Sequence, residues 1–293
     1  MLDGRDAMFW RPAENSAVQC ELCPRFCHIP GNAHGFCGAR ENTGGKLIAS
    51  NYGRISSVAL DPIEKKPLYK FHPGGQILSI GGFGCNLRCP FCQNYDISIE
   101  YGNSNRAVNL LSPDNIVSLA QKTVVDGSIG VAYTYNEPLI GYEYIYDCAK
   151  LIRGAGLCNV IVTNGYICKE PLEKLLPLID AMNIDLKGFT DGFYKKTGGN
   201  LTTVMETIAL SYKRCHLEIT TLVIPDENEH DIEELAKWLS SVDPDIPLHL
   251  SRFFPRYKYS GMAPTPRETI LRLRETAKKY LSNVYSGNME TGG

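Results

Sequence analysis

The sequence predicts an α/β protein: a partial, open parallel β/α barrel of about six units with a small N-terminal cysteine-rich segment. Between residues 76 and 286, short apolar runs typical of strands alternate with segments whose apolar residues recur at helical spacing. Strands that are each followed by a helix pair in parallel through right-handed crossovers. A closed eight-stranded barrel has more units than we find, and a flat doubly wound sheet is the alternative that periodicity leaves open.

Strands and helices are expected in alternation. The expected strands are 76–83, 129–135, 158–163, 181–186, 216–224, 247–252 and 283–286. The expected helices are 112–127, 139–154, 170–178, 202–213, 229–241 and 266–280. The first helix illustrates the reasoning, because Ser112 is a good N-cap, Pro113 suits the first helical position and Gly127 ends the helix.

The chain divides into three parts. We expect residues 1–45 to be a cysteine-rich segment that binds a metal or an iron–sulfur cluster, and residues 76–293 to form the barrel. Residues 46–75 are expected to connect the two and pack on the barrel. Within this connection, Glu64-Lys65-Lys66 is a charged triplet between two prolines that oppose a continuous helix. It is either a solvated turn or a feature near the active site.

Composition narrows the class of protein. The net charge is −2 and the basic residues are scattered, so we expect no nucleic-acid partner. No apolar run approaches the length of a membrane span, and the first residues lack the apolar core of a signal peptide. Eleven cysteines without an export signal favour a reducing interior and metal ligation over disulfides. We therefore expect a cytoplasmic protein with no membrane partner.

Four cysteines lie close together near the N-terminus: Cys20, Cys23, Cys27 and Cys37. Four thiolates fill every position of a zinc ion or hold an iron–sulfur cluster, and the spacing leaves both possibilities open. So short a segment cannot bury a core alone. We therefore expect the bound metal to supply much of its folding free energy.

A second set, Cys85, Cys89 and Cys92, follows the first strand of the barrel directly. Such close spacing suits a metal or an iron–sulfur cluster better than a disulfide. A structural zinc site needs four ligands, and no fourth Cys or His follows nearby, although His72 is a more distant possibility. Three thiolates on a four-iron cube leave one iron open to bind another molecule.

Polar residues recur where the expected strands end, which is where barrels of this kind gather their functional groups. They are Tyr135, Asn136, Glu137, Thr163, Asn164, Asp185, Lys187, His249, Ser251 and Arg252. Each alone has an ordinary explanation, such as a turn or a salt bridge. Their shared position beside a loop with three thiols predicts an active site.

The cysteine loop resembles a known family. Cys-x3-Cys-x2-Cys with an aromatic residue before the last Cys is similar to the signature of radical S-adenosylmethionine (SAM) enzymes. The stretch 84–96 is similar to the pyruvate formate-lyase activating-enzyme branch. The AmmeMemoRadiSam-system radical enzymes resemble the chain more closely. They share the four-Cys block, the stretch 61–69, Tyr-Thr-Tyr-Asn-Glu-Pro at 133–138 and the sequence from His249 to Pro255.

The resemblance implies an oxidoreductase that reductively cleaves SAM at a 4Fe–4S cluster, producing a 5′-deoxyadenosyl radical that abstracts hydrogen from a substrate. It implies that Cys85, Cys89 and Cys92 hold the cluster and that Asn136 and Glu137 bind the SAM amino group. The implied contacts to the methionine carboxylate or the ribose are Thr163, Asn164, Asp185 and Lys187, and those to substrate are His249 and Arg252.

The expected partners are an electron donor such as flavodoxin or ferredoxin, and a substrate that is either a small molecule or a protein. An activase for a glycyl-radical enzyme is one alternative. An iron–sulfur electron-transfer protein is another, and it leaves the polar strand ends without a role. A zinc-binding interaction module is a third, and it predicts a colourless protein.

Overall fold

The computed structural model describes residues 4–100 and 108–289. Its main sheet has the linear order β16-β15-β14-β13-β12-β11-β9-β8. The strands are β8 (Ser57–Pro62), β9 (Gln76–Gly81), β11 (Ser128–Tyr133), β12 (Cys158–Thr163), β13 (Ala181–Asp185), β14 (His216–Val223), β15 (Leu248–Arg252) and β16 (Val284–Gly287). All neighbours pair in parallel except β8, which is antiparallel to β9. Because β8 and β16 form its two edges, the sheet is an open, partial barrel, and this prediction is confirmed.

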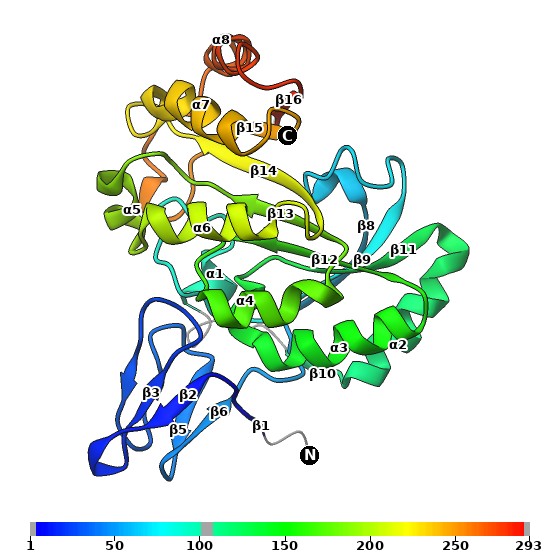
Figure 1. Cartoon of the computed structure of the whole chain (residues 1–293), viewed down its shortest axis with the longest axis vertical. Helices are drawn as coiled ribbons and strands as arrows, with labels where there is room; N and C mark the ends of the chain where they lie inside the picture. Colours follow the sequence, from blue (N-terminus) through cyan, green and yellow to red (C-terminus); the bar gives the residue numbers. More distant parts are fainter. Residues whose placement is uncertain (1–3, 101–107, 290–293) are drawn as a thin grey trace.

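Helices cover the outer face of this curved sheet, as Figure 1 shows for α3, α4 and α6. The α-helices are α1 (Tyr95–Ser98), α2 (Pro113–Lys122), α3 (Tyr142–Gly154), α4 (Lys169–Leu175), α5 (Asp191–Thr197), α6 (Leu201–Ser211), α7 (Ile232–Val242) and α8 (Arg267–Ala277). Ser112 caps α2 by accepting a hydrogen bond from the Asn115 N–H, as its sequence predicts. The short helix α5 was not expected.

Alternate side chains of each strand face the covering helices and the inside of the barrel. In β13, Met182 and Ile184 belong to the main core with the helices, whereas Asn183 and Asp185 face the inside of the barrel. At the N-terminal ends of the strands the inside is filled by Ile63 and Leu68, which come from the segment after β8. The free space of the barrel therefore lies at the carboxyl ends of the strands.

The N-terminal region forms two small sheets beside the barrel (Figure 1, blue). Their strands are β1 (Arg5–Asp6), β2 (Trp10–Pro12), β3 (Val18–Cys20), β4 (His28–Ile29), β5 (Arg40–Thr43) and β6 (Lys46–Ala49). A further two-stranded pair joins β7 (Arg54–Ile55) to β10 (Asn109–Leu110).

The N-terminal region is tied to the barrel by its core and by a buried ion pair. Val18, Leu22 and Leu47 are buried in the same apolar cluster as the barrel helices. Arg40 donates to both carboxylate oxygens of Glu143 on α3, at 2.8 and 2.9 Å. The region therefore shares a core with the barrel, in addition to any metal that it binds. Within the described residues, the helices are too short or too polar to cross a membrane.

Candidate active site

The three cysteines of the loop after β9 line one cavity of about 360 Å³ at the carboxyl ends of the strands. The loop leaves β9 through Gly84, whose φ of +86° is unfavourable for other residues. A Cβ at this position would also overlap the carbonyl oxygen of Cys37, so the glycine lets the loop pack against the N-terminal region. Within the loop, the Leu87 N–H lies 3.3 Å from Cys85 Sγ.

Burial keeps these thiols neutral in the protein without a cluster. Burial raises the pKa of Cys85 and Cys92, and it raises that of Cys89 to about 12. The Lys187 ammonium acts in the opposite direction on Cys89 and Cys92. A metal centre that binds thiolates therefore has to displace three protons, and Lys187 favours that change.

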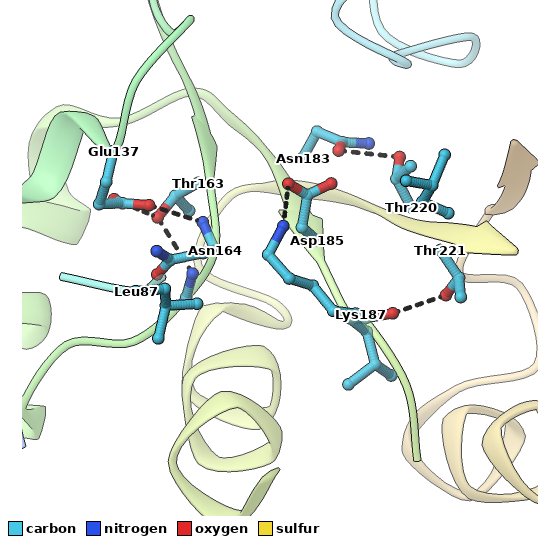
Figure 2. A network of polar contacts seen from close by, with 12 residues as sticks. Leu87, Glu137, Thr163, Asn164, Asn183, Asp185, Lys187, Thr220 and Thr221 are labelled. Carbon is cyan, nitrogen blue, oxygen red and sulfur yellow. Dashed lines mark hydrogen bonds and ion pairs between the residues drawn. The ribbon is translucent and has the colours of Figure 1, made fainter. Parts of the chain in front are cut away.

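Glu137 lies at the centre of a buried hydrogen-bond network (Figure 2). Its carboxylate accepts hydrogen bonds from Thr163 Oγ1 at 2.7 Å, from the Asn164 N–H at 2.8 Å and from the Leu139 N–H at 3.0 Å. The last of these caps the short 3₁₀ helix Pro138–Gly141. Burial raises the pKa of Glu137 to about 7, although all three hydrogen bonds favour its ionised form. Glu137 thus both caps a helix and lines the cavity.

Asn164 and Asn136 connect the strand ends to the cysteine loop. The Asn164 amide donates to Asn86 Oδ1 at 2.9 Å and lies 3.6 Å from Cys85 Sγ. The Asn136 side chain accepts from the Gly82 N–H at 3.0 Å and donates to Gly84 O at 3.1 Å. Asn136 lines the cavity, but its amide already holds the loop in place.

Asp185 and Lys187 form an ion pair of 3.0 Å at the end of β13 (Figure 2). Burial disfavours the Lys187 ammonium, but the Asp185 carboxylate opposes it and raises the pKa of Lys187. The Asp185 side chain is 37% exposed, so it can take a further partner from the cavity. At this wall the cavity therefore has the Lys187 ammonium and the carboxyl groups of Asp185 and Glu137 beside its three thiols.

His249 and Arg252 do not line this cavity. His249 shares the inner face of β15 with Ser251 but lies two residues deeper, where its Nε2 is 2.6 Å from Glu218 Oε2. Its ring packs against Tyr69 and Tyr285. The Arg252 Nε donates to Thr265 O at 2.9 Å. The other strand-end residues expected from the sequence are all among the lining residues.

Several lining residues were not expected from the sequence: Asn94, Thr134, Thr220, Leu222 and Asn288. Tyr135 and Ser251, at two of the expected strand ends, also line the cavity. Strand alternation could have found two of the others, because Thr220 and Leu222 occupy alternate positions on the face that carries Asp185 and Ser251. Lys65 and Lys66 reach the cavity from a segment that precedes the barrel. In the sequence, the charged triplet between two prolines was the sign that these two lysines lie near the active site.

The four N-terminal cysteines surround a separate cavity of about 10 Å³. Burial raises the pKa of Cys20, that of Cys23 to about 12 and that of Cys37 to about 11. In residues 4–100 and 108–289, no three His, Cys, Asp or Glu side chains converge closely enough to hold a single metal ion. Asn86, from the loop of the first site, also lines this second cavity.

The sequence of the barrel matches a known family. Residues 79–239, more than half of the chain, match the family model of the Radical SAM superfamily. The chain belongs to this superfamily and is an enzyme.

"Uncharacterized protein MJ0808" of Methanocaldococcus jannaschii is 42% identical over 291 residues, which are 97% of this chain and 85% of that protein. The pyruvate formate-lyase-activating enzyme of Clostridium pasteurianum is 28% identical over 169 residues, 55% of this chain and 69% of that enzyme. The resemblance to the activating-enzyme branch is confirmed.

A solved structure supports the fold. SuiB of Streptococcus suis, crystallised bound to S-adenosylmethionine, superposes with a TM-score of 0.53 at 16% identity. The match covers 71% of this chain and 48% of SuiB. At this identity the similarity concerns the fold alone.

Proposed function

We propose that Cys85, Cys89 and Cys92 hold a 4Fe–4S cluster at which the enzyme cleaves SAM and generates a radical that abstracts hydrogen from a substrate. The observation that carries this proposal is the set of three thiols that line a cavity together with an ion pair and a buried carboxyl group. Of the chain's eleven cysteines, no others line this cavity. Three ligands suit a cube that keeps one iron for SAM.

The residues present fit such a cluster. A cube spreads its irons over separate corners, so its thiolates do not have to converge on one point. N–H groups of Leu87 and Asn164 lie near Cys85 Sγ, where they stabilise a thiolate that shares charge with iron. When bound, the cluster and SAM supply the one-electron cleavage and the radical, while the protein supplies binding, orientation and exclusion of water.

We assign the SAM amino group to Glu137. An ammonium beside this carboxyl group opposes the effect of burial on its pKa, because the ionised form gains a cation in a buried site. The Thr163 and Asn164 hydrogen bonds hold the Glu137 carboxylate at the cavity wall while the ammonium binds. Lys187 suits the methionine carboxylate, and Asp185 suits the ribose hydroxyls.

The N-terminal cysteines are proposed to bind a second metal centre, either an iron–sulfur cluster or zinc, and zinc requires their thiols to turn toward one point. This proposal is supported by the position of the four cysteines, which all line one small cavity. Metal analysis distinguishes the two: zinc near one per chain indicates a structural ion, and iron beyond one cube indicates a second cluster. The electron for SAM cleavage is proposed to come from a small redox protein such as flavodoxin or ferredoxin.

Activation of a glycyl-radical enzyme is the second candidate function. It is favoured by the similarity to the pyruvate formate-lyase-activating enzyme of Clostridium pasteurianum. In that case the substrate is a glycine in a protein rather than a small molecule.

The experiment that tests the first proposal uses anaerobically reconstituted protein reduced with dithionite. We expect 5′-deoxyadenosine and methionine to form in equal amounts from SAM. Deuterium transfer from a labelled cell extract into 5′-deoxyadenosine would then report hydrogen abstraction. A protein that carries a full cluster and forms no 5′-deoxyadenosine would contradict the proposal.

A further inference from the structure

Two lysines from the segment after β8 reach the active-site cavity. Lys66 is almost fully buried, with a side chain 4% exposed, and its Nζ lies 2.8 Å from Asp61 Oδ2. The Lys65 Nζ lies 3.4 Å from the other oxygen of the same carboxylate, and its side chain is exposed. Both lysines line the cavity that the three thiols share. None of the roles assigned above to the SAM-binding residues uses them.

Tyr135 completes this group in a strained conformation. Its hydroxyl donates to Asp61 Oδ2 at 2.8 Å, and its ring centre lies 4.8 Å from Lys66 Nζ. Its φ of 72° is a left-handed conformation that bulky residues rarely adopt. A Cβ at Gly81 would lie 2.9 Å from Tyr135 Cβ, so a neighbouring glycine makes room for it. Strain of this kind is typical of functional sites.

The group carries a surplus of positive charge. Burial disfavours the Asp61 carboxylate, but hydrogen bonds from Lys66 and Tyr135 outweigh it and hold the pKa of Asp61 at about 2. Asp61 is therefore ionised, and among the described residues it is the acidic side chain that pairs with both lysines. One carboxylate beside two ammonium groups leaves about one positive charge at this wall. Each ammonium has three N–H donors, and Asp61 does not use them all.

We infer that Lys65 and Lys66, the latter positioned by Asp61 and Tyr135, form a subsite for an anionic group of the substrate, a carboxylate or a phosphate. This inference rests on the proposed function and specifies its substrate class. A small anionic molecule fits a wall with surplus positive charge, whereas a glycine in a protein backbone is neutral. The subsite therefore favours a small-molecule substrate over a glycyl-radical enzyme.

The first test is chemical modification of the lysines without any turnover. Full-length reconstituted protein is acetylated in the presence of inorganic phosphate, malonate or pyruvate, with chloride at equal ionic strength as the reference. Mass spectrometry measures the rate at each lysine. We expect at least one of the three anions to protect Lys65, which lines the cavity and is exposed, while exposed Lys70, in the same segment but outside the cavity, reacts as in chloride. If none of them protects Lys65, the subsite does not exist.

The second test removes the charge. Lys65→Met leaves the buried Lys66–Asp61 pair intact. Its cluster content and SAM titration should equal those of the parent, because Glu137, Asp185 and Lys187 are unchanged. A weakened SAM affinity in this variant would assign Lys65 to SAM and overturn the inference. Lys70→Met is the matched control, since it removes one charge from the same segment outside the cavity.

The third test identifies the substrate class. A deuterated cell extract is separated by anion exchange into anionic small molecules, other small molecules and proteins. Deuterium in 5′-deoxyadenosine should come from the anionic fraction, and Lys65→Met should reduce the transfer about tenfold, as expected for loss of a charge-assisted contact. Transfer from another fraction overturns the inference. If no fraction transfers deuterium, the proposed reaction fails, and the protection experiment alone then decides whether the anion subsite exists.

Discussion

The two cysteine sets of this protein differ in number and in the space around them. Three thiols of the loop after β9 line a cavity of about 360 Å³ together with Glu137, Asp185 and Lys187. Four N-terminal thiols surround about 10 Å³, and the charged residues that line that cavity are Arg25 and Arg40. The first set leaves room for another molecule beside its thiols, and the second leaves far less. Free volume and ionisable neighbours therefore distinguish the two sets.

Changing one thiol of the loop should have the largest effect. We expect Cys89→Ala to abolish formation of 5′-deoxyadenosine by dithionite-reduced protein, because two thiolates hold a cube poorly. Cys215→Ala is the control, since Cys215 lines neither cavity. Product formation by Cys89→Ala at the parent rate would show that the cluster is held elsewhere.

The second prediction concerns the link between the two regions. Arg40 and Glu143 form an ion pair with side chains 1% and 2% exposed. Arg40→Met leaves a buried carboxylate without its cation, so it should lower the free energy of unfolding by about 3–5 kcal/mol. Urea unfolding followed by circular dichroism measures this.

Two further variants make the Arg40 prediction specific. Arg40→Met/Glu143→Leu should recover much of the stability, because no buried charge remains. Arg11→Met breaks an exposed pair with Glu21 and should cost no more than about 1 kcal/mol. Equal losses in Arg11→Met and Arg40→Met would mean that the buried pair does not join the regions.

The sequence predicted the long helices and strands of the fold better than the short ones. The parallel strands and the longer helices have clear periodicity, so their order and type were predicted. The N-terminal strands span two to four residues, too few for an alternating pattern. Helix α5 has seven residues, yet Thr190 caps its start and Gly198 ends it in the left-handed region, so a signal was present.

At the active site, prediction from the sequence failed for a different reason. The sequence shows where a strand ends, but it does not show whether a side chain near that end reaches the cavity or lies below it. His249 and Ser251 point to the same face, and only Ser251 reaches the cavity because Glu218 holds His249 below it. Lys66 enters from a distant segment, through contacts with Asp61 and Tyr135 that no local pattern encodes.

Glu137→Gln should have a smaller effect than either change above. Glutamine keeps the shape and loses the charge, so we expect SAM affinity to fall about tenfold, or about 1.4 kcal/mol. A titration of the cluster spectrum with SAM measures this. Normal affinity together with a lowered melting temperature would leave Glu137 with its helix-capping role alone.

The smallest effect concerns pH. Since burial raises the pKa of Glu137 from 4.5 to about 7, its contribution to stability is complete below pH 4.5 and is lost as the pH rises through about 7. Binding of an ammonium needs the ionised form. SAM affinity should therefore rise as the pH increases from about 6 to about 8, by at most about tenfold per unit below the pKa. The same titration of Glu137→Gln should be flat over this range, and a parallel rise in both proteins would assign the effect to another group.

The measurement that tests the central claim most directly locates the iron that binds SAM. Electron paramagnetic resonance spectra of the reduced cluster are recorded with and without SAM, in the parent protein and in Cys23→Ala, which alters only the N-terminal set. We predict that SAM changes the spectrum in both, because the open iron belongs to the loop of Cys85, Cys89 and Cys92. A response that disappears in Cys23→Ala, while the loop cluster is intact, would contradict the account.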